Sequence, residues 1–188
     1  ACVFFEWGFE KLCHTPSTIS DLSAAVTGVL LAMNLPVSIP LWQAVFGALV
    51  AIVAVKGLFG GIGKNFANPA ITARIVMFLA FSKTMTAWVF PDAVSSATPL
   101  AMMANGESVD YLTLLLGNHG GCLGETSALA LLIGFAYLLI RGVISWHTPV
   151  CFVGTVFVMS LILGQDAVGQ ILSGGLMLGA IFMATDYS

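Results

Sequence analysis

Charged residues are scarce in this sequence. Only 8% of its 188 residues are charged, and the mean hydropathy is +1.00, whereas an ordinary soluble domain is about a quarter charged. Several apolar runs approach the roughly 20 residues that a helix needs to cross about 30 Å of hydrocarbon, and none alternates with the period of a barrel strand. The composition therefore excludes an ordinary soluble domain and predicts an all-α polytopic membrane protein.

Cysteine is scarce as well. The four cysteines lie far apart, with no CxxC pair, at Cys2, Cys13, Cys122 and Cys151. This spacing excludes the usual ligand patterns of zinc and iron–sulfur sites. We expect no metal site, and we expect the cysteines to serve as small packing residues.

The apolar runs between glycine, proline and charged residues predict seven helices, near 1–12, 21–35, 41–59, 66–90, 126–140, 149–164 and 169–185. The pattern breaks over 91–125. Within it, the run Tyr111 to Gly117 is too short to span and is typical of an interfacial or re-entrant segment. We expect one transmembrane domain over 1–188, incomplete at both ends because no methionine precedes Ala1 and an apolar run stops abruptly at Ser188.

Basic residues orient the predicted spans. Alternate crossings place Lys11, Lys56, Lys64 and Arg141 in loops or helix ends on one face. The other face receives 91–125, which has acidic residues but no lysine or arginine. Because cytoplasmic loops carry the excess of basic residues, the 91–125 loop is predicted to be extracytoplasmic.

Two apolar helices follow similar acidic openings. DLSAAVTGVLLAMNL begins at Asp21 and ETSALALLIGFAYLL begins at Glu125, and the crossing scheme makes them run in opposite directions. This favours an inverted repeat, although a chance match of small residues is the alternative. Each acid either caps its helix, as the helix dipole favours, or, for Glu125 with Thr126 and Ser127, lines a site for a ligand or ion.

A charged side chain lies inside one apolar run. Arg74 falls about ten residues into 66–90, where a charge costs about 2.5–3.5 kcal/mol on insertion scales. The glycines before it, with Asn65, Asn68 and Pro69, suit a broken helix or re-entrant turn whose polar groups face a cofactor or ion. The alternative is an ordinary loop followed by a helix with Pro69 in its first turn.

The stretch DAVSSATPL carries three hydroxyls and an acid. It is either a solvated turn or a site of modification. Pro99 keeps the preceding Thr98 out of the helical region, so that its hydroxyl lies on extended, accessible backbone. No lysine or histidine base stands beside Thr98, so self-catalysed nucleophilic chemistry is not indicated, and we predict no catalytic residue.

The acceptor pattern is carried by Asp92, Ser95, Ser96, Ala97 and Thr98. It resembles the target sequence of flavin transferases, which join FMN through its phosphate to the threonine hydroxyl. With GGIGKNFANPAITAR and GNHGGCLGETSALALLIGFAYLL, the chain resembles the D subunit of the Rnf complex, which is related to the B subunit of the Na+-translocating NADH:quinone oxidoreductase. Ser96 departs from the glycine common in Rnf, and the proline after Thr98 looks more like the Rnf form.

The resemblance implies a urea-channel-like bundle of two inverted repeats in a prokaryotic inner membrane. It implies a subunit, not catalytic alone, of an Na+- or H+-translocating ferredoxin:NAD+ oxidoreductase, in which covalent FMN on Thr98 relays electrons. The expected partners are the other Rnf subunits, including a second FMN-bearing subunit and iron–sulfur subunits, a flavin transferase and the lipid bilayer, but no nucleic acid. A second, noncovalent flavin such as riboflavin is left open. The rival functions are a passive channel or carrier for a small polar solute, and a purely structural scaffold.

Overall fold

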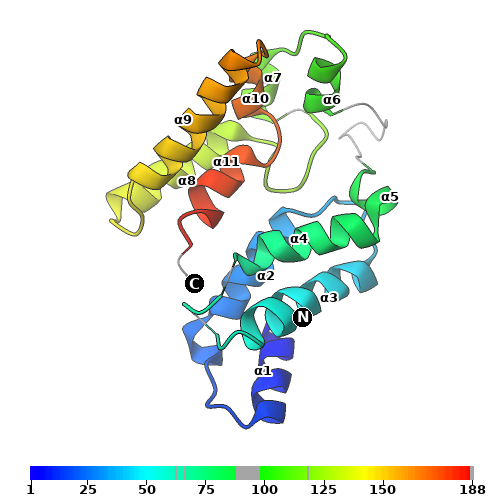
Figure 1. The fold of residues 1–188 in the computed structure, drawn as a ribbon, viewed down its shortest axis with the longest axis vertical. Coiled ribbons are helices and arrows are strands. Elements are labelled where there is room, and N and C mark those ends of the chain that lie inside the picture. Colours follow the sequence, from blue (N-terminus) through cyan, green and yellow to red (C-terminus); the bar gives the residue numbers. More distant parts are fainter. Residues whose placement is uncertain (62, 66, 88–97, 118, 187–188) are drawn as a thin grey trace. The chain divides into compact units, whose positions relative to one another are not determined.

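The computed structural model describes residues 1–61, 63–65, 67–87, 98–117 and 119–186, and over these residues it contains helices and no strand. The all-α prediction is confirmed for them. The chain divides into two compact units, Ala1–Thr86 with Asp186–Ser188 and Ala87–Thr185, and each is described by itself (Figure 1). The single transmembrane domain over 1–188 stays a prediction.

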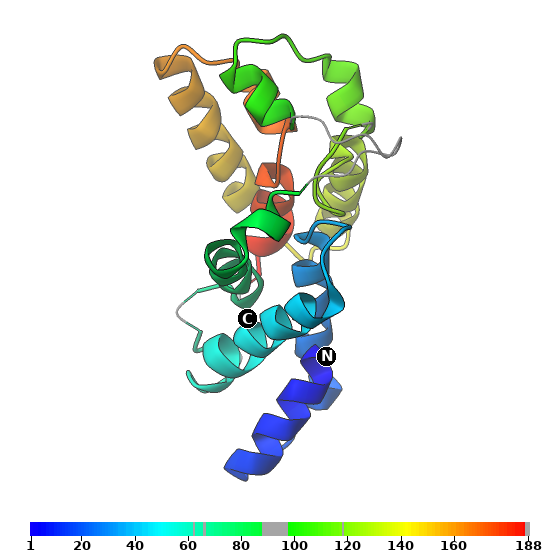
Figure 2. The same cartoon turned by 90° about the vertical axis from the view of Figure 1, so that its right-hand side faces the viewer.

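Over its described residues, the first unit is built from five α-helices, one 3₁₀ turn and one π-helix. They are α1 (Cys2–Cys13), η1 (Ile19–Asp21), α2 (Ser23–Met33), α3 (Leu41–Leu49), the π-helix η2 (Val50–Gly57), α4 (Pro69–Ala80) and α5 (Ser82–Met85). The helix α3 continues directly into η2. Figure 2 shows this continuous helix crossing α4, which contacts both parts of it.

Small side chains bring the helices of this unit close together. The core cluster joins Cys2 of α1, Ala24 of α2, and Ala48 and Ile52 of the continuous helix formed by α3 and η2. Where α3 crosses α4, a Cβ on Gly47 would come within 2.2 Å of the sulfur of buried Met77. Close packing of helices through glycine and alanine suits a chain in which most side chains are apolar and few polar side chains can form hydrogen bonds between helices.

The part of the second unit that the structure describes contains six α-helices and a π-helix. They are α6 (Pro99–Ala104), α7 (Tyr111–Leu116), α8 (Ala128–Ile140), α9 (His147–Ile162), α10 (Ala167–Leu172), α11 (Leu176–Leu178) and η3 (Gly179–Met183). The helix α10 contacts α9, α7 and α6. The helix expected after Asp21 therefore lies in one unit and that after Glu125 in the other.

Two predicted helices are interrupted. The run 66–90 begins as a helix only at Pro69 and breaks at Phe81, whose φ of −131° and ψ of 42° end α4. The Phe81 ring packs edge-on against Trp42 and Phe46, with ring centroids 5.1 and 5.5 Å apart. The helix therefore ends where tertiary contacts are made, at a position without a glycine or proline in the sequence. The run 169–185 breaks where Gly174 adopts a φ of 67°.

The predictions for 126–140 and 149–164 are confirmed by α8 and α9, and the short element at Tyr111 to Gly117 is α7. Its interfacial or re-entrant position stays a prediction. Over the part of the chain that the structure describes, no helix has both the length and the apolarity needed to cross a membrane.

Candidate functional site

Thr98 lies at the N-terminus of α6, in the second unit. Its φ of −66° and ψ of 155° are extended, as the following Pro99 dictates. The Thr98 Oγ1 accepts a hydrogen bond of 3.3 Å from the backbone N–H of Ala101, the usual contact of an N-cap threonine. The predicted extended backbone at Thr98 is therefore confirmed, and the side chain is half-buried. The other residues of the acceptor pattern, Asp92, Ser95, Ser96 and Ala97, lie outside the described residues.

The hydroxyl of Thr98 fits esterification by FMN phosphate. Its oxygen accepts one bond, and among the described residues no acceptor takes its O–H. Exchanging the O–H for an O–P bond therefore breaks no hydrogen bond within the described part of the protein. The chemistry of the residue present is thus compatible with a covalent flavin.

The helix that carries Thr98 packs closely against two glycines, one in α10 and one just after it. A Cβ on Gly169 would come within 2.5 Å of the sulfur of Met103, and a Cβ on Gly174 within 2.9 Å of Leu100 Cδ1. These contacts fix both turns of α6 against its neighbour. Thr98 is consequently held at a defined position relative to α10.

A pocket of about 550 Å³ with a mixed polar and apolar lining opens at the other end of α6. Its lining includes Met103 and Ala104 from α6, Glu107, Tyr111 at the start of α7, and Gln165 and Gln170 around the start of α10. The Tyr111 hydroxyl donates a 2.8 Å hydrogen bond to Asp166 Oδ2. This bond favours the neutral phenol and so raises the pKa of Tyr111 above its ordinary value.

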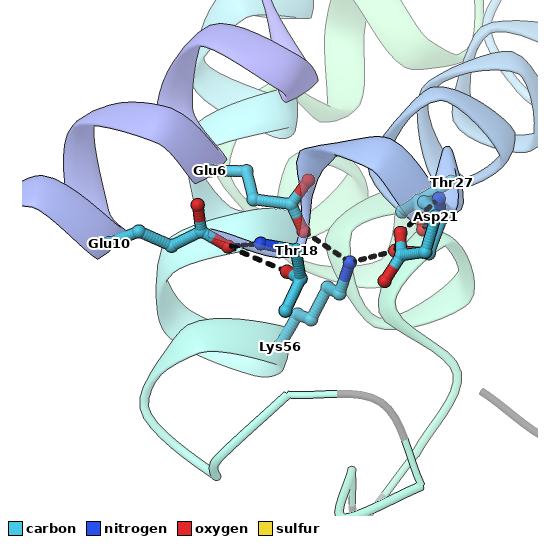
Figure 3. Close-up of polar contacts among 7 residues, drawn as sticks. Glu6, Glu10, Thr18, Asp21, Thr27 and Lys56 are labelled. Atoms are coloured by element: carbon cyan, nitrogen blue, oxygen red, sulfur yellow. Dashed lines mark hydrogen bonds and ion pairs between the residues drawn. The ribbon is translucent and has the colours of Figure 1, made fainter. Parts of the chain in front are cut away.

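The first unit contains a buried ion pair that the sequence did not predict. Lys56 Nζ lies 2.5 Å from Glu6 Oε1 and also donates to Ser23 Oγ. Ser23 Oγ in turn donates to Asp21 Oδ1 over 2.5 Å. Figure 3 shows the Lys56 side chain reaching between Glu6 and the residues that begin α2. Lys56 is only 4% exposed and lies in the last turn of η2, within the helix predicted over 41–59.

A cavity of about 250 Å³ adjoins this pair and is lined by Glu6, Glu10, Lys56 and the hydroxyl-bearing Thr18, among others. Glu10 Oε1 accepts hydrogen bonds from Thr18 N–H and Oγ1 at 2.8 and 2.6 Å. The second oxygen of each glutamate is buried and has no hydrogen-bond partner among the described residues. Two carboxylates beside one ammonium leave this cavity with an excess of negative charge.

Arg74 has a protein partner in the first unit. Its Nη1 donates a 2.8 Å hydrogen bond to Oδ1 of buried Asn34, the C-cap residue of α2. The sequence did not single out Asn34, since nothing local marks an asparagine that meets an arginine 40 positions later. The predicted need of Arg74 for a polar partner is met, at least in part, within the protein.

The asparagines before Arg74 divide into two kinds. Asn68 is the N-cap of α4: its Oδ1 accepts from the N–H groups of Ala70 and Ile71, and Pro69 is the first helical residue. This is the ordinary loop-then-helix arrangement that was the alternative to a broken helix. The amide nitrogen and oxygen of Asn65, in contrast, are buried without a hydrogen-bond partner among the described residues.

Glu125, Thr126 and Ser127 form a tight corner in the second unit. The N-cap of α8 is Ser127, whose Oγ accepts from Ala130 N–H, so the prediction that Glu125 caps this helix is wrong. Glu125 is instead buried over Gly121, where a Cβ would meet its Oε1 at 2.9 Å. Asp21 does bind its helix, because its Oδ1 accepts from Ser23 N–H at the start of α2. A ligand or ion at Glu125 to Ser127 stays a prediction.

These predicted residues fall into two groups. Asn65, Asn68 and Arg74 belong to the first unit, and Thr98 and Glu125 to Ser127 belong to the second. In the described residues, no group of three or more His, Cys, Asp or Glu side chains is placed to hold a metal ion.

Known proteins resemble this chain over nearly all of its length. A family model described as "NQR2, RnfD, RnfE family" matches residues 1–188. The D subunit of the Na(+)-translocating ferredoxin:NAD(+) oxidoreductase complex of Acetobacterium woodii is 47% identical over 187 residues, a match that covers 95% of this chain and 59% of that relative.

Two further relatives extend this similarity. Identity is 36% to the D subunit of the proton-translocating ferredoxin:NAD(+) oxidoreductase complex of Clostridium ljungdahlii, over 99% of this chain and 63% of that protein. It is 37% to the B subunit of the Na(+)-translocating NADH-quinone reductase of Azotobacter vinelandii, over 99% of this chain and 52% of that protein. The chain thus spans between about half and two thirds of the length of these relatives. Because the family model covers all 188 residues, the chain belongs to the NQR2, RnfD, RnfE family.

Proposed function

We propose that this chain is part of a membrane subunit of an ion-translocating ferredoxin:NAD+ oxidoreductase, in which FMN esterified to Thr98 relays electrons. The observation that carries the proposal is the Thr98 hydroxyl itself. It stands on extended backbone at the start of α6, in the sequence DAVSSATPL, and its O–H bonds to no acceptor among the described residues. Names of relatives at 47% and 36% identity support the same class of complex.

The attachment is a group transfer performed by a partner enzyme. Thr98 loses its hydroxyl proton and gains a phosphoester bond, while a flavin transferase supplies FMN from a flavin dinucleotide and a nucleoside monophosphate leaves. The protein then holds the flavin at high effective concentration near its redox partners. The flavin accepts and donates electrons, and the chain supplies position and electrostatics.

The remaining parts of the proposal concern the membrane and the complex. The subunit lies in a prokaryotic inner membrane as a bundle of two inverted repeats, with the Thr98 loop on the extracytoplasmic side. Other Rnf subunits bring the iron–sulfur centres, because the four cysteines of this chain lack cluster spacing. The transported ion is Na+ or H+.

Coupling is proposed to pass through polar groups held in apolar surroundings. Reduction of the flavin changes its charge, and this change biases a two-state rearrangement of the repeats. Arg74, Asn65, Asn68 and Glu125 belong to the coupled region, because charged and amide groups are expensive in such surroundings and tend to be functional. If replacing each of them left electron transfer and ion uptake equally intact, the coupling scheme would be wrong.

The first experiment is mass spectrometry of the peptide that contains Thr98, after coexpression with a flavin transferase. Wild type is expected to carry the added mass of FMN and to give a fluorescent band after denaturation. Thr98→Ala is expected to carry none. Thr155→Ala, which removes an exposed threonine hydroxyl from α9, is the matched control and is expected to load fully.

An unmodified wild-type peptide beside an active transferase would overturn the covalent-flavin proposal. The passive channel or carrier for a small polar solute would then be tested by solute flux into vesicles. If neither covalent flavin nor solute flux were found, the remaining function would be that of a purely structural scaffold.

A further inference from the structure

The pocket at the end of α6 stands in a fixed relation to Thr98. Leu100 and Met103 of α6 pack against Gly174 and Gly169. The helix α10 also lines the pocket through Gln170. Both the attachment point and the pocket therefore belong to one packed group of helices. A flavin tethered at Thr98 starts from a defined distance and direction relative to the pocket.

The length of the tether matches the length of the helix. The six residues of α6 rise about 9 Å at 1.5 Å per residue. The phosphoester and ribityl chain between a threonine oxygen and the flavin ring contains about eight single bonds, which in a staggered chain extend about 10 Å. The ring of an FMN on Thr98 consequently reaches the pocket when its tether lies extended along α6.

The surface of α6 leaves room for such a tether. Residues three apart share one face of a helix, and the positions that follow Thr98 on this face are Ala101 and Ala104. Both are exposed alanines. No large side chain of α6 therefore stands between Thr98 and the pocket on that face.

The lining of the pocket suits a flavin ring. The Tyr111 side chain lines the pocket, is half exposed and donates its hydroxyl proton to Asp166. An aromatic ring is therefore available there for offset stacking. Gln165 and Gln170, which share a 3.4 Å hydrogen bond from Gln170 Nε2 to Gln165 Oε1, add further amide donors and acceptors to the lining, and a flavin ring carries nitrogens and carbonyls that can pair with such groups. The volume of about 550 Å³ is in the range of small-molecule sites.

We propose that this pocket is the seat of the isoalloxazine ring of the flavin attached to Thr98, with Tyr111 stacked on the ring. The proposal rests on the proposed function, because it needs FMN on Thr98. It assigns Tyr111 as a positioning residue for the cofactor and predicts a ring shielded on one face.

The test uses the flavin-loaded subunit within its complex and reads flavin fluorescence, which a stacked tyrosine quenches by electron transfer to the excited ring. Tyr111→Leu is expected to raise the fluorescence per attached FMN several-fold and to increase its quenching by iodide. Tyr111→Trp restores an aromatic, electron-donating face without the hydroxyl that binds Asp166, so it is expected to stay as dim as wild type. Tyr137→Leu is the matched control, because Tyr137 on α8 is 60% exposed and lies outside the pocket lining.

Mass spectrometry of the Thr98 peptide in each variant separates the two possible failures. If wild type carries no FMN, the proposed function itself is refuted. If all variants carry FMN but Tyr111→Leu and Tyr137→Leu match wild type in fluorescence and iodide quenching, the flavin ring lies elsewhere and the proposed binding pocket is refuted. A bright Tyr111→Trp variant would also refute stacking, since it would trace the effect to the lost hydroxyl.

Discussion

Replacing Lys56 by methionine tests the buried ion pair of the first unit. Lys56 Nζ and Glu6 Oε1 are 2.5 Å apart, and the two side chains are only 5% and 6% exposed. At an effective dielectric constant of about 20, unit charges at this distance attract by about 7 kcal/mol. Removing both charges from water costs several kcal/mol for each ion. The net contribution of the pair to the free energy of unfolding is therefore small. Each charge nevertheless needs the other, because either one alone would be buried without compensation.

Single and double replacements are accordingly expected to differ. Lys56→Met leaves Glu6 as an uncompensated buried charge and is expected to lower the free energy of unfolding by about 3–5 kcal/mol, or the melting temperature by about 6–20 °C. Glu6→Gln with Lys56→Met removes both charges and is expected to recover most of that loss. Lys83→Met, at an exposed lysine of α5, is the control and should change stability by less than about 0.5 kcal/mol.

The chain offers its own reporter for this experiment. Cys2 is buried near the start of α1, the helix that carries Glu6, whereas Cys13 and Cys151 are exposed. With the other three cysteines replaced by serine, a maleimide dye that fluoresces on thiol reaction follows the opening of the first unit during a thermal scan. A double variant no more stable than Lys56→Met would refute the reasoning, as would a single variant as stable as wild type.

Other predictions concern the second unit. A Cβ on Gly117, which has a φ of 94°, would meet the backbone carbonyl oxygen of Thr126 at 2.6 Å, so Gly117→Ala is expected to destabilise by about 1–3 kcal/mol in thermal unfolding. Gly154 lies inside α9, where a Cβ would meet nothing within 4 Å, so Gly154→Ala is expected to stabilise by about 0.5–1 kcal/mol, and a loss of stability would contradict open space there. Asp166→Asn is expected to return the raised pKa of Tyr111 toward 10.0 in an absorbance titration. Because the fold favours the neutral phenol, the hydrogen bond from Tyr111 to Asp166 stabilises the folded state below the pKa that Tyr111 has in the unfolded chain. This stabilisation is lost as the pH rises through the pKa of Tyr111 in the folded protein. An unchanged titration in Asp166→Asn would show that the hydrogen bond does not raise the pKa of Tyr111.

Features set by neighbouring residues could be predicted from the sequence. Pro99 dictates the extended backbone of Thr98, and Pro69 marks the first turn of α4, as the structure has them. The long apolar runs predicted α8 and α9 within two residues at each end. The attachment of FMN to Thr98 stays a prediction, because it depends on a partner enzyme.

Features set by distant residues could not be predicted. The bend at Phe81 depends on rings of Trp42 and Phe46, about 40 positions earlier. The burial of Lys56 could not be predicted because its partner, Glu6, lies 50 positions away. Hydrophobic periodicity predicts which face of a helix is apolar, but it does not predict which buried charged side chains form ion pairs with each other.

The π-helix Val50–Gly57 gives the ion pair a mechanical consequence. A π turn closes between residues five apart, whereas an α turn closes between residues four apart. Conversion of this segment to α geometry would turn every later residue by about 100° around the axis. Lys56 lies at the end of the segment, so such a turn would carry its ammonium away from Glu6. The contact between Lys56 and Glu6 is therefore tied to the π geometry of this segment.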